Sequence, residues 1–445
     1  MKRTLIQNAT IVNEGKQFRG SVVIEGEKIA EILPAGINPP TPFDAIIDAS
    51  NCYLLPGVID GHVHFRDPGL THKADITTES QAAVAGGVTS IMDMPNTVPQ
   101  TTTIDALYEK LDLYAGKSLI NYSCYFGATN DNYKLFPQLD SSRVCGIKLF
   151  MGSSTGNMLV DEEKQLNNIF NGTDMLIAAH CENQDRINAN LQFYSKYKVN
   201  DDLPVKYHRM IRDGYACKTS TEKAIGLATQ ANARLHVLHL STSIELSLFS
   251  RQPLPGKRIT AEACIPHLMF STGDYKTFKS LIKCNPAIKT KVDNRCLRQA
   301  VNSGKIDVIS TDHAPHLLSE KTGGALKAMS GIPMIQFSLV SMLSLADEKV
   351  FTIEKIVEKM CHAPAQLYNI AGRGYIRNGY QADLVLIRQE DWEVNTGVIY
   401  SKCKWSPFEG KTFHWKVDKT FVNGNLVYFA GQMDDSYHGQ ELRFG

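Results

Sequence analysis

The most informative stretch of the sequence is Gly57-Val58-Ile59-Asp60-Gly61-His62-Val63-His64-Phe65-Arg66-Asp67. An apolar run leads into alternating polar residues, a pattern typical of a strand that ends at a functional site. Side chains alternate between the two faces of a strand, which predicts one polar face. The residues expected on that face are Asp60, His62, His64 and Arg66.

The two histidines indicate a metal site. Neutral imidazole is the commonest transition-metal ligand, and the spacing of His62 and His64 lets one strand supply two nitrogens to one ion. A His-x-His pair alone is a weak signal, because many such histidines only pack in a core. Its place after an apolar run and before Arg66 strengthens the prediction.

Short apolar runs alternate with segments of helical character through the middle of the chain. The clearest runs are residues 86–94, 146–150, 175–180, 235–239 and 306–312. This alternation predicts βα units and a parallel sheet, and in a closed (β/α)8 barrel the polar strand ends would meet at one face. An open doubly wound sheet also places sites at strand ends, but no Gly-x-Gly-x-x-Gly or Walker loop supports it. We therefore expect an α/β protein with a TIM-like barrel.

The two ends of the chain share a sequence pattern that differs from that of the middle. Strand patterns broken by glycine occupy the first fifty residues, and similar patterns recur at 382–387 and 419–428. Both ends could share one sheet. The expected division is a first part of a β-sandwich at 1–55, a metal-dependent barrel at 56–370, and a second part of the sandwich at 371–445.

Three later strand ends carry further candidate ligands. His180 follows an apolar run, and a satisfied core histidine is its competing interpretation. His236 and His239 are three apart, so a strand would send them to opposite faces; His239 is nearer the end and is the expected ligand. Asp312 suits a carboxylate that is both ligand and proton carrier, although a helix cap is possible there.

Lys148 lies in the apolar run 144–152, where a lone buried ammonium would be costly. A hypothesis is that CO2 adds to the neutral amine and gives a carbamate that bridges two ions as a carboxylate would. The competing interpretation is a lysine that extends to the barrel rim.

Composition excludes several classes of protein. The 445 residues carry 47 basic and 46 acidic side chains, a net charge of +1, so nothing electrostatic favours nucleic acid or a membrane surface. The ten cysteines form no Cys-x-x-Cys pair, which favours reduced, mostly buried thiols. No signal peptide or membrane-spanning run is expected, and the predicted location is cytoplasmic.

The order of these residues resembles the amidohydrolase superfamily along essentially the whole chain. The resemblance rests on His62-Val63-His64 after Pro56-Gly57-Val58-Ile59-Asp60, followed by Lys148, His180, His239 and Asp312. It implies a (β/α)8 barrel with a small β-sandwich built from both chain ends. Within the superfamily, residues 61–69, 94–97 and 311–316 are similar to the dihydroorotase family, which interconverts N-carbamoyl-L-aspartate and L-dihydroorotate in de novo pyrimidine (UMP) biosynthesis.

The resemblance also implies roles for single residues. The implied ligands of two divalent metal ions, zinc as first choice, are His62, His64, Lys148 as N6-carboxylysine, His180, His239 and Asp312. A metal-bridging hydroxide would attack, and Asp312 would be the catalytic proton shuttle. Arg66, Asn96 and His316 would hold the substrate carboxylate, Asn285 would contact substrate, and the loop 330–333 would offer backbone groups.

The chain departs from the family pattern in two places. Some dihydroorotases carry Asp in the region of Lys148, so this chain resembles the lysine-bearing branch. The frequent Glu-x-x-Pro-His-His-Leu stands here as Glu262-Ala263-Cys264-Ile265-Pro266-His267-Leu268, and a structural role is preferred for Glu262 and His267.

Two other functions compete with this interpretation. Allantoinase or dihydropyrimidinase (hydantoinase) would use the same metals on a substrate without this carboxylate, and Arg66 is the discriminating residue. A non-catalytic scaffold protein would lack metal ligands, and none is missing here. The expected partner is a small-molecule substrate rather than nucleic acid or membrane, with a homodimer as a possibility.

Overall fold

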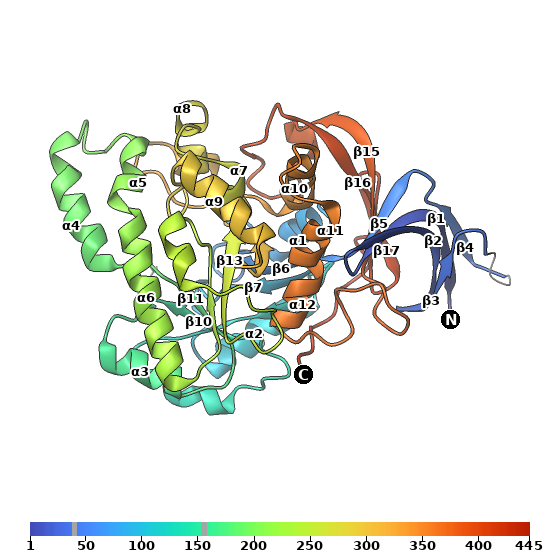
Figure 1. Cartoon of the computed structure of the whole chain (residues 1–445), viewed down its shortest axis with the longest axis horizontal. Coiled ribbons are helices and arrows are strands. Elements are labelled where there is room, and N and C mark those ends of the chain that lie inside the picture. Colours follow the sequence, from blue (N-terminus) through green and yellow to red (C-terminus); the bar gives the residue numbers. More distant parts are fainter. Residues whose placement is uncertain (38–41, 153–157) are drawn as a thin grey trace.

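The computed structural model describes residues 1–37, 42–152 and 158–445, which form a barrel and a terminal β-sheet (Figure 1). The barrel strands are β6 (Val58–Val63), β7 (Val88–Asp93), β8 (Asn121–Cys124), β9 (Phe126–Gly127), β10 (Ile147–Phe150), β11 (Ile177–His180), β12 (Leu235–Val237), β13 (Ile259–Cys264) and β14 (Val308–Ser310). Every pairing between neighbours in this set is parallel. Only Tyr125 separates β8 from β9, so the described residues give eight barrel strands when these two are counted as one.

The barrel closes between its first and last strands. Val63 at the end of β6 forms a parallel bridge with His313, three residues beyond β14. The His64 amide then donates to the His313 carbonyl at 2.8 Å. The expected (β/α)8 barrel is therefore confirmed, and the carboxyl ends of its strands meet at one face.

Helices cover the outside of the barrel, and their ends follow ordinary capping chemistry. Asp75, Thr103 and Asp213 accept from backbone amides in the first turns of α1, α2 and α6, which satisfies donors that a helix leaves unpaired. The helices are α1 (Ile76–Ala85), α2 (Ile104–Ala115), α3 (Glu163–Asn171), α4 (Gln184–Tyr194), α5 (His208–Ile211), α6 (Gly214–Ala231), α7 (Ile265–Met269), α8 (Tyr275–Phe278), α9 (Lys291–Asn302), α10 (Ser338–Asp347), α11 (Ile353–Val357) and α12 (Ala363–Leu367).

The two chain ends build one sheet, at the right of Figure 1. Its strands are β1 (Arg3–Asn13), β2 (Lys16–Glu25), β3 (Lys28–Pro34), β4 (Ala45–Asp48), β5 (Cys52–Pro56), β15 (Leu384–Glu393), β16 (Thr412–Val422), β17 (Asn425–Phe429) and β18 (Gln432–Met433). Antiparallel pairing of β5 with β15 joins the two ends, with Leu54 opposite Leu386. Both side chains lie in one buried apolar cluster with residues of β1, β2 and β16. This is the expected composite β-sandwich.

The last residues return to the barrel. Leu442 is fully buried, its amide donates to the Tyr122 carbonyl at 2.8 Å, and Glu441 pairs with Arg143 at 2.7 Å. The segment after β18 therefore packs against barrel strands although it follows the sheet in sequence. We propose that the domain boundaries lie at 55/56 and 370/371.

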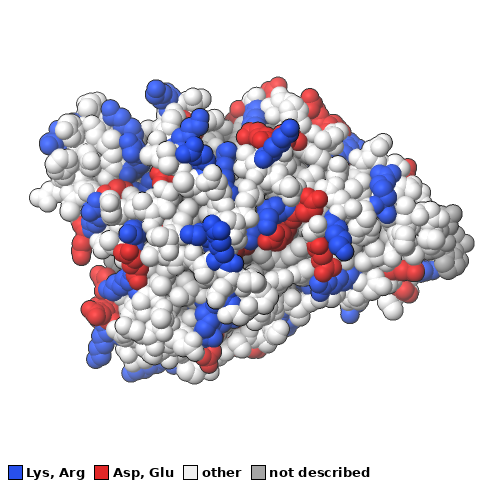
Figure 2. Space-filling view, in the orientation of Figure 1, with Lys and Arg blue, Asp and Glu red and all other residues white. Residues whose placement is uncertain are grey.

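Three general properties of the described chain bear on function. Lys and Arg side chains are interspersed with Asp and Glu over the face in Figure 2. Among the described residues, no helix has the length and apolar character needed to cross a bilayer. All ten cysteines are unpaired, and nine of them are buried.

Candidate active site

A cavity of about 310 Å³ opens at the carboxyl ends of the barrel strands. It brings together all ten predicted site residues, which come from segments spread over 255 positions of the chain. The cavity lining includes His62, His64, Arg66, Asn96, Lys148, His180, His239, Asn285, Asp312 and His316. Phe150, Lys283, Ala314 and the segment 326–331, of which residue 327 is not in the lining, complete the wall.

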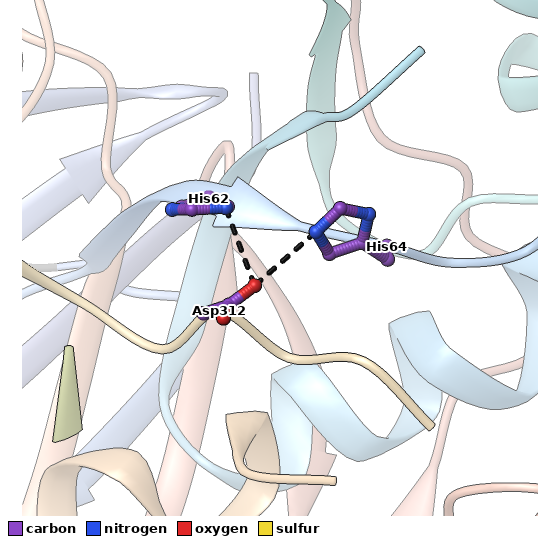
Figure 3. A group of neighbouring side chains, drawn as sticks. All are labelled: His62, His64 and Asp312. Carbon is purple, nitrogen blue, oxygen red and sulfur yellow. Dashed lines mark ion pairs between the residues drawn. The ribbon is translucent and has the colours of Figure 1, made fainter. Parts of the chain in front are cut away.

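Two imidazoles converge on one carboxylate oxygen, as Figure 3 shows. Nε2 of His62 lies 3.3 Å and Nε2 of His64 lies 3.2 Å from Oδ1 of Asp312. The other ring nitrogens are already engaged, because Nδ1 of His62 donates to Glu262 at 2.8 Å and Nδ1 of His64 donates to Asn96 at 2.7 Å. In a ring that carries its hydrogen on Nδ1 alone, Nε2 presents a lone pair to the carboxylate, an arrangement that suits a cation among the three atoms.

The charges of this group are set by its neighbours. Burial lowers the pKa of His64 to about 4, so that ring is neutral at pH 7. Burial alone would raise the pKa of Asp312, but positive charge on the His62 and His64 rings outweighs it and holds that pKa below its usual value, and a cation held among the three atoms would act in the same direction. Asp312 is therefore ionised and able to accept a proton or to bind a cation.

A second pair of histidines comes from the end of β11 and from the turn after β12. Nδ1 of His180 and Nε2 of His239 are 2.8 Å apart, and Nε2 of His180 lies 2.9 Å from Glu182. Arg212 pairs with the same Glu182 carboxylate. Burial would raise the pKa of Glu182, but Arg212 and His180 lower it to about 2. The Nδ1 atom of His239 is buried and has no hydrogen-bond partner among the described residues.

Lys148 projects from β10 into the same cavity. The side chain is 1% exposed, and its Nζ lies 4.4 Å from the centroid of the Phe150 ring. Burial lowers the pKa of the amine to about 8. A substantial fraction of Lys148 is therefore neutral near pH 8 and able to act as a nucleophile.

The opposite wall of the cavity is cationic. Nη2 of Arg66 lies 3.2 Å from Nε2 of His316, and Nζ of Lys73 lies 3.3 Å from Nδ1 of the same ring. Burial, with Arg66 and Lys73 alongside, lowers the pKa of His316 to about 2, so this ring stays neutral. A neutral imidazole between two cations suits recognition of a carboxylate.

Three of the site residues have left-handed backbone conformations, which are uncommon outside glycine. Their φ angles are 67° at Arg66, 39° at His239 and 50° at Asp312. Each lies just beyond the end of its strand, since β6 ends at Val63 and β12 at Val237. Strand alternation was therefore the wrong reason for placing Arg66 and His239, whose side chains reach the cavity through turns.

Three further residues discussed from the sequence, His236, His267 and Glu262, lie close to the cavity or support its walls. His236, expected to pack, is fully buried and contacts Thr260 at 2.8 Å. His267 lies 2.9 Å from the carbonyl oxygen of Pro286 and supports the loop that carries Asn285. Glu262, for which we preferred a structural role, contacts His62 and also accepts from the His239 amide at 3.0 Å.

Glu182, Arg212 and Lys283 are site residues that sequence reasoning missed. Glu182 follows His180 by two positions at a strand end, and this spacing could have indicated that both side chains lie on the same face. Lys283 lines the cavity and Arg212 pairs with Glu182 behind it. Both lie in loops, where no periodic pattern marks such residues.

The donor set fits divalent cations. Converging imidazole nitrogens and a carboxylate are what a nitrogen- and oxygen-ligated hydrolytic metal prefers, and the unpartnered nitrogen of His239 leaves a polar need unmet. Glu262 and Asn96 hold the tautomers that leave ligand nitrogens free, as outer partners of metal-binding histidines do.

Substitution of Glu262 tests this positioning. In E262Q the carboxylate that holds His62 Nδ1–H is lost, and we expect zinc affinity to fall by about 10- to 100-fold, measured by competition with a chelating dye. The matched control is E245Q, because Glu245 is equally buried but hydrogen-bonds Thr221. Equal zinc affinity of E262Q and wild type would show that Glu262 does not orient a ligand.

Comparison with known proteins places this geometry in a family. The model of the amidohydrolase family matches residues 53–427, most of the chain. A dihydroorotase of Methanosphaera stadtmanae is 30% identical over 92% of this chain and 92% of its own length. An allantoinase of Bacillus velezensis is 28% identical over 96% of this chain and 94% of its own length.

A solved structure agrees with the fold. The L-hydantoinase (dihydropyrimidinase) of Arthrobacter aurescens superposes with a TM-score of 0.92 at 25% identity and covers 100% of both chains. The barrel, the terminal β-sandwich and the match over most of the sequence together establish that the chain belongs to the amidohydrolase family.

Proposed function

We propose that the chain is a dihydroorotase, which interconverts N-carbamoyl-L-aspartate and L-dihydroorotate in pyrimidine biosynthesis. The observation that carries the proposal is Arg66 beside neutral His316, in the same cavity as the convergent His62, His64 and Asp312 group. The substrate keeps a free carboxylate while a cyclic amide forms or opens. A guanidinium fork at one end of the cavity and hydrolytic ligands at the other match those two needs.

The substrate would be oriented by this chain's own side chains. Arg66 offers a planar bidentate partner for the free carboxylate, with His316 as a neighbouring polar group. The Asn96 oxygen already accepts from His64, which leaves its amide nitrogen as a donor. The side-chain oxygen of Asn285 is buried without a partner, so a substrate N–H group would satisfy it.

Asp312 would carry the proton. Its lowered pKa keeps it ionised, so it accepts the proton of the attacking water during ring opening. It then returns that proton to the leaving ring nitrogen. In the cyclising direction the same carboxylate takes the proton from the carbamoyl nitrogen.

Two divalent cations, zinc as first choice, would be held by His62, His64, Lys148, His180, His239 and Asp312. Such ions, when bound, acidify water and polarise the amide carbonyl. Lys148 could join the ligands only without its positive charge, so we propose that its neutral amine adds to the carbon of CO2. A proton is released, and the N6-carboxylysine formed carries a negative charge.

Allantoinase and hydantoinase are the alternative functions, since relatives so named share the family and the fold. Their substrates lack the free carboxylate of dihydroorotate. In either case Arg66 would lie beside His316 without a substrate carboxylate to bind, whereas Lys73 already pairs with Glu320. Arg66 therefore favours dihydroorotase.

We also propose a cytoplasmic location, which ten unpaired cysteines fit. A homodimer is proposed only on the general ground that it is the commonest oligomer of soluble proteins.

An assay with three substrates tests the function. We expect the purified, zinc-loaded protein to open L-dihydroorotate and to leave dihydrouracil and allantoin unchanged. Ultraviolet absorbance and chromatography would monitor the three reactions. In R66K the charge remains but the fork is lost, and kcat/KM for dihydroorotate should fall by about 10- to 100-fold, the loss of a charge-assisted hydrogen bond.

The exposed arginine Arg19 supplies the control, because R19K should leave kcat/KM unchanged. Turnover of dihydrouracil or allantoin with no turnover of dihydroorotate would overturn the proposed function. Full activity of R66K would remove Arg66 from the carboxylate site.

Modification of Lys148 is tested by native mass spectrometry. With a pKa of about 8, the neutral fraction of the amine rises between pH 7 and 9, so carbamate occupancy at fixed dissolved CO2 should rise over that range. We expect wild type to carry the added mass of one CO2 and K148A to lack it. An unmodified lysine in fully metallated, active protein would contradict the proposal.

A further inference from the structure

Lys321 is a buried lysine whose ammonium group binds only backbone carbonyls. It belongs to the short 3-10 helix Leu318–Lys321 and is 2% exposed. Its Nζ donates to the carbonyl oxygens of Lys283 at 3.0 Å, Met329 at 2.8 Å and Gly331 at 2.7 Å. Three donors meet three acceptors, so the ammonium group is fully satisfied without a carboxylate.

These carbonyls belong to two separate walls of the active-site cavity. Lys283 lies on the loop that leads to Asn285, whereas Met329 and Gly331 lie on the loop that follows His316. The two loops also bond directly, since the Gly331 amide donates to the Lys283 carbonyl at 2.9 Å. Nζ of Lys283 in turn donates to the Ala328 carbonyl. Lys321 thus lies behind the seam between the walls.

The same position connects to the cationic wall. Nζ of Lys321 lies 5.9 Å from the centroid of the Trp405 ring, and the indole nitrogen of Trp405 donates to the His316 carbonyl at 2.8 Å. Glu320, the neighbour of Lys321, pairs with Lys73 at 2.8 Å instead. Lys321 is therefore surrounded by the segments that present His316, Gly331 and Asn285 to the cavity.

The backbone at Gly331 packs closely against Ala314 and His316. Gly331 has a φ of 148°, and a Cβ atom added there would lie 2.5 Å from the Ala314 carbonyl oxygen and 2.8 Å from His316 Cδ2. Burying an ammonium group is costly, and burial lowers the pKa of Lys321 to about 7. The three carbonyl acceptors oppose this effect of burial, because they bind the charged amine most strongly.

We propose that Lys321 is a positioning residue for substrate binding: its ammonium group takes the place of a structural cation and fixes the two loops that wall the carboxylate end of the cavity. It touches no reacting atom. The expected change in KM rests on the proposed function, whereas the expected change in amide hydrogen exchange does not.

Replacement by methionine keeps the length of the side chain and removes its three donors. In K321M the carbonyls of Met329 and Gly331 lose the Lys321 donor and the Lys283 carbonyl keeps only the Gly331 amide, so the loops should loosen. We expect KM for dihydroorotate to rise by about tenfold while kcat stays within about threefold, because orientation of the substrate's non-reacting end is lost. K321R retains the charge and several donors, and its KM should lie between those of K321M and wild type.

K359M is the matched control, because Lys359 is also buried but pairs with Glu358 outside the cavity lining. Its KM should equal that of wild type. Unchanged KM in folded K321M would overturn the proposal, as would an equal rise in K359M. If K321M does not fold, K321R decides: a KM raised by about threefold supports the proposal, and an unchanged KM contradicts it.

Amide hydrogen exchange separates this inference from the proposed function. Peptides that cover residues 283–285 and 328–331 should exchange faster in K321M or K321R than in wild type and K359M, whatever the substrate is. Wild type without dihydroorotase activity would refute the function alone. Unchanged exchange in these peptides would refute the role of Lys321.

Discussion

Closure of the barrel between β6 and β14 is the constraint on which the site depends. Val63 bridges His313, and the buried Asp60 carboxylate accepts from the Thr311 amide at 3.1 Å. Burial raises the pKa of Asp60 to about 6, and its bonds to Thr311 act in the opposite direction. His62 and His64 lie on one side of this seam and Asp312 on the other. His62 and Asp312 are 250 positions apart in the sequence, and closure of the barrel brings them together in space.

Electrostatics divides the cavity into two ends. At one end, neutral imidazoles and an ionised carboxylate present electron pairs that suit cations. At the other, Arg66, Lys73 and Lys321 lie near neutral His316, with Glu320 paired to Lys73 and three carbonyls bound to Lys321. Arg66 is buried without a carboxylate partner among the described residues, which favours an anionic substrate. The two ends together orient a molecule that has one free carboxylate and one reactive amide.

Much of this arrangement was predictable from the sequence. Apolar runs that end on His62, His180, His239 and Asp312 predicted both the barrel and the convergence of its strand ends, because strand periodicity and barrel geometry are local and general. Glycine-broken strand patterns likewise predicted a sheet shared by both chain ends, which pairing of β5 with β15 confirms.

The rest depends on loop geometry and on contacts distant in sequence. The left-handed turns at Arg66 and His239 were not predicted, since the apolar runs before them indicate continued strand and do not mark where each strand ends. Glu262 was assigned a structural role, and its contact with His62 spans 200 positions. Lys321 binds only backbone carbonyls, which leave no trace in the pattern of side chains.

The most direct test of the account is the turnover of L-dihydroorotate by D312N loaded with metal to the wild-type level. Asp312 joins the cation-binding group to the proposed proton transfer, and asparagine keeps its size while removing the proton acceptor. The account predicts that kcat falls by at least about 100-fold while far-ultraviolet circular dichroism is unchanged. A kcat within about threefold of wild type would contradict the assignment of Asp312 and with it the proposed mechanism.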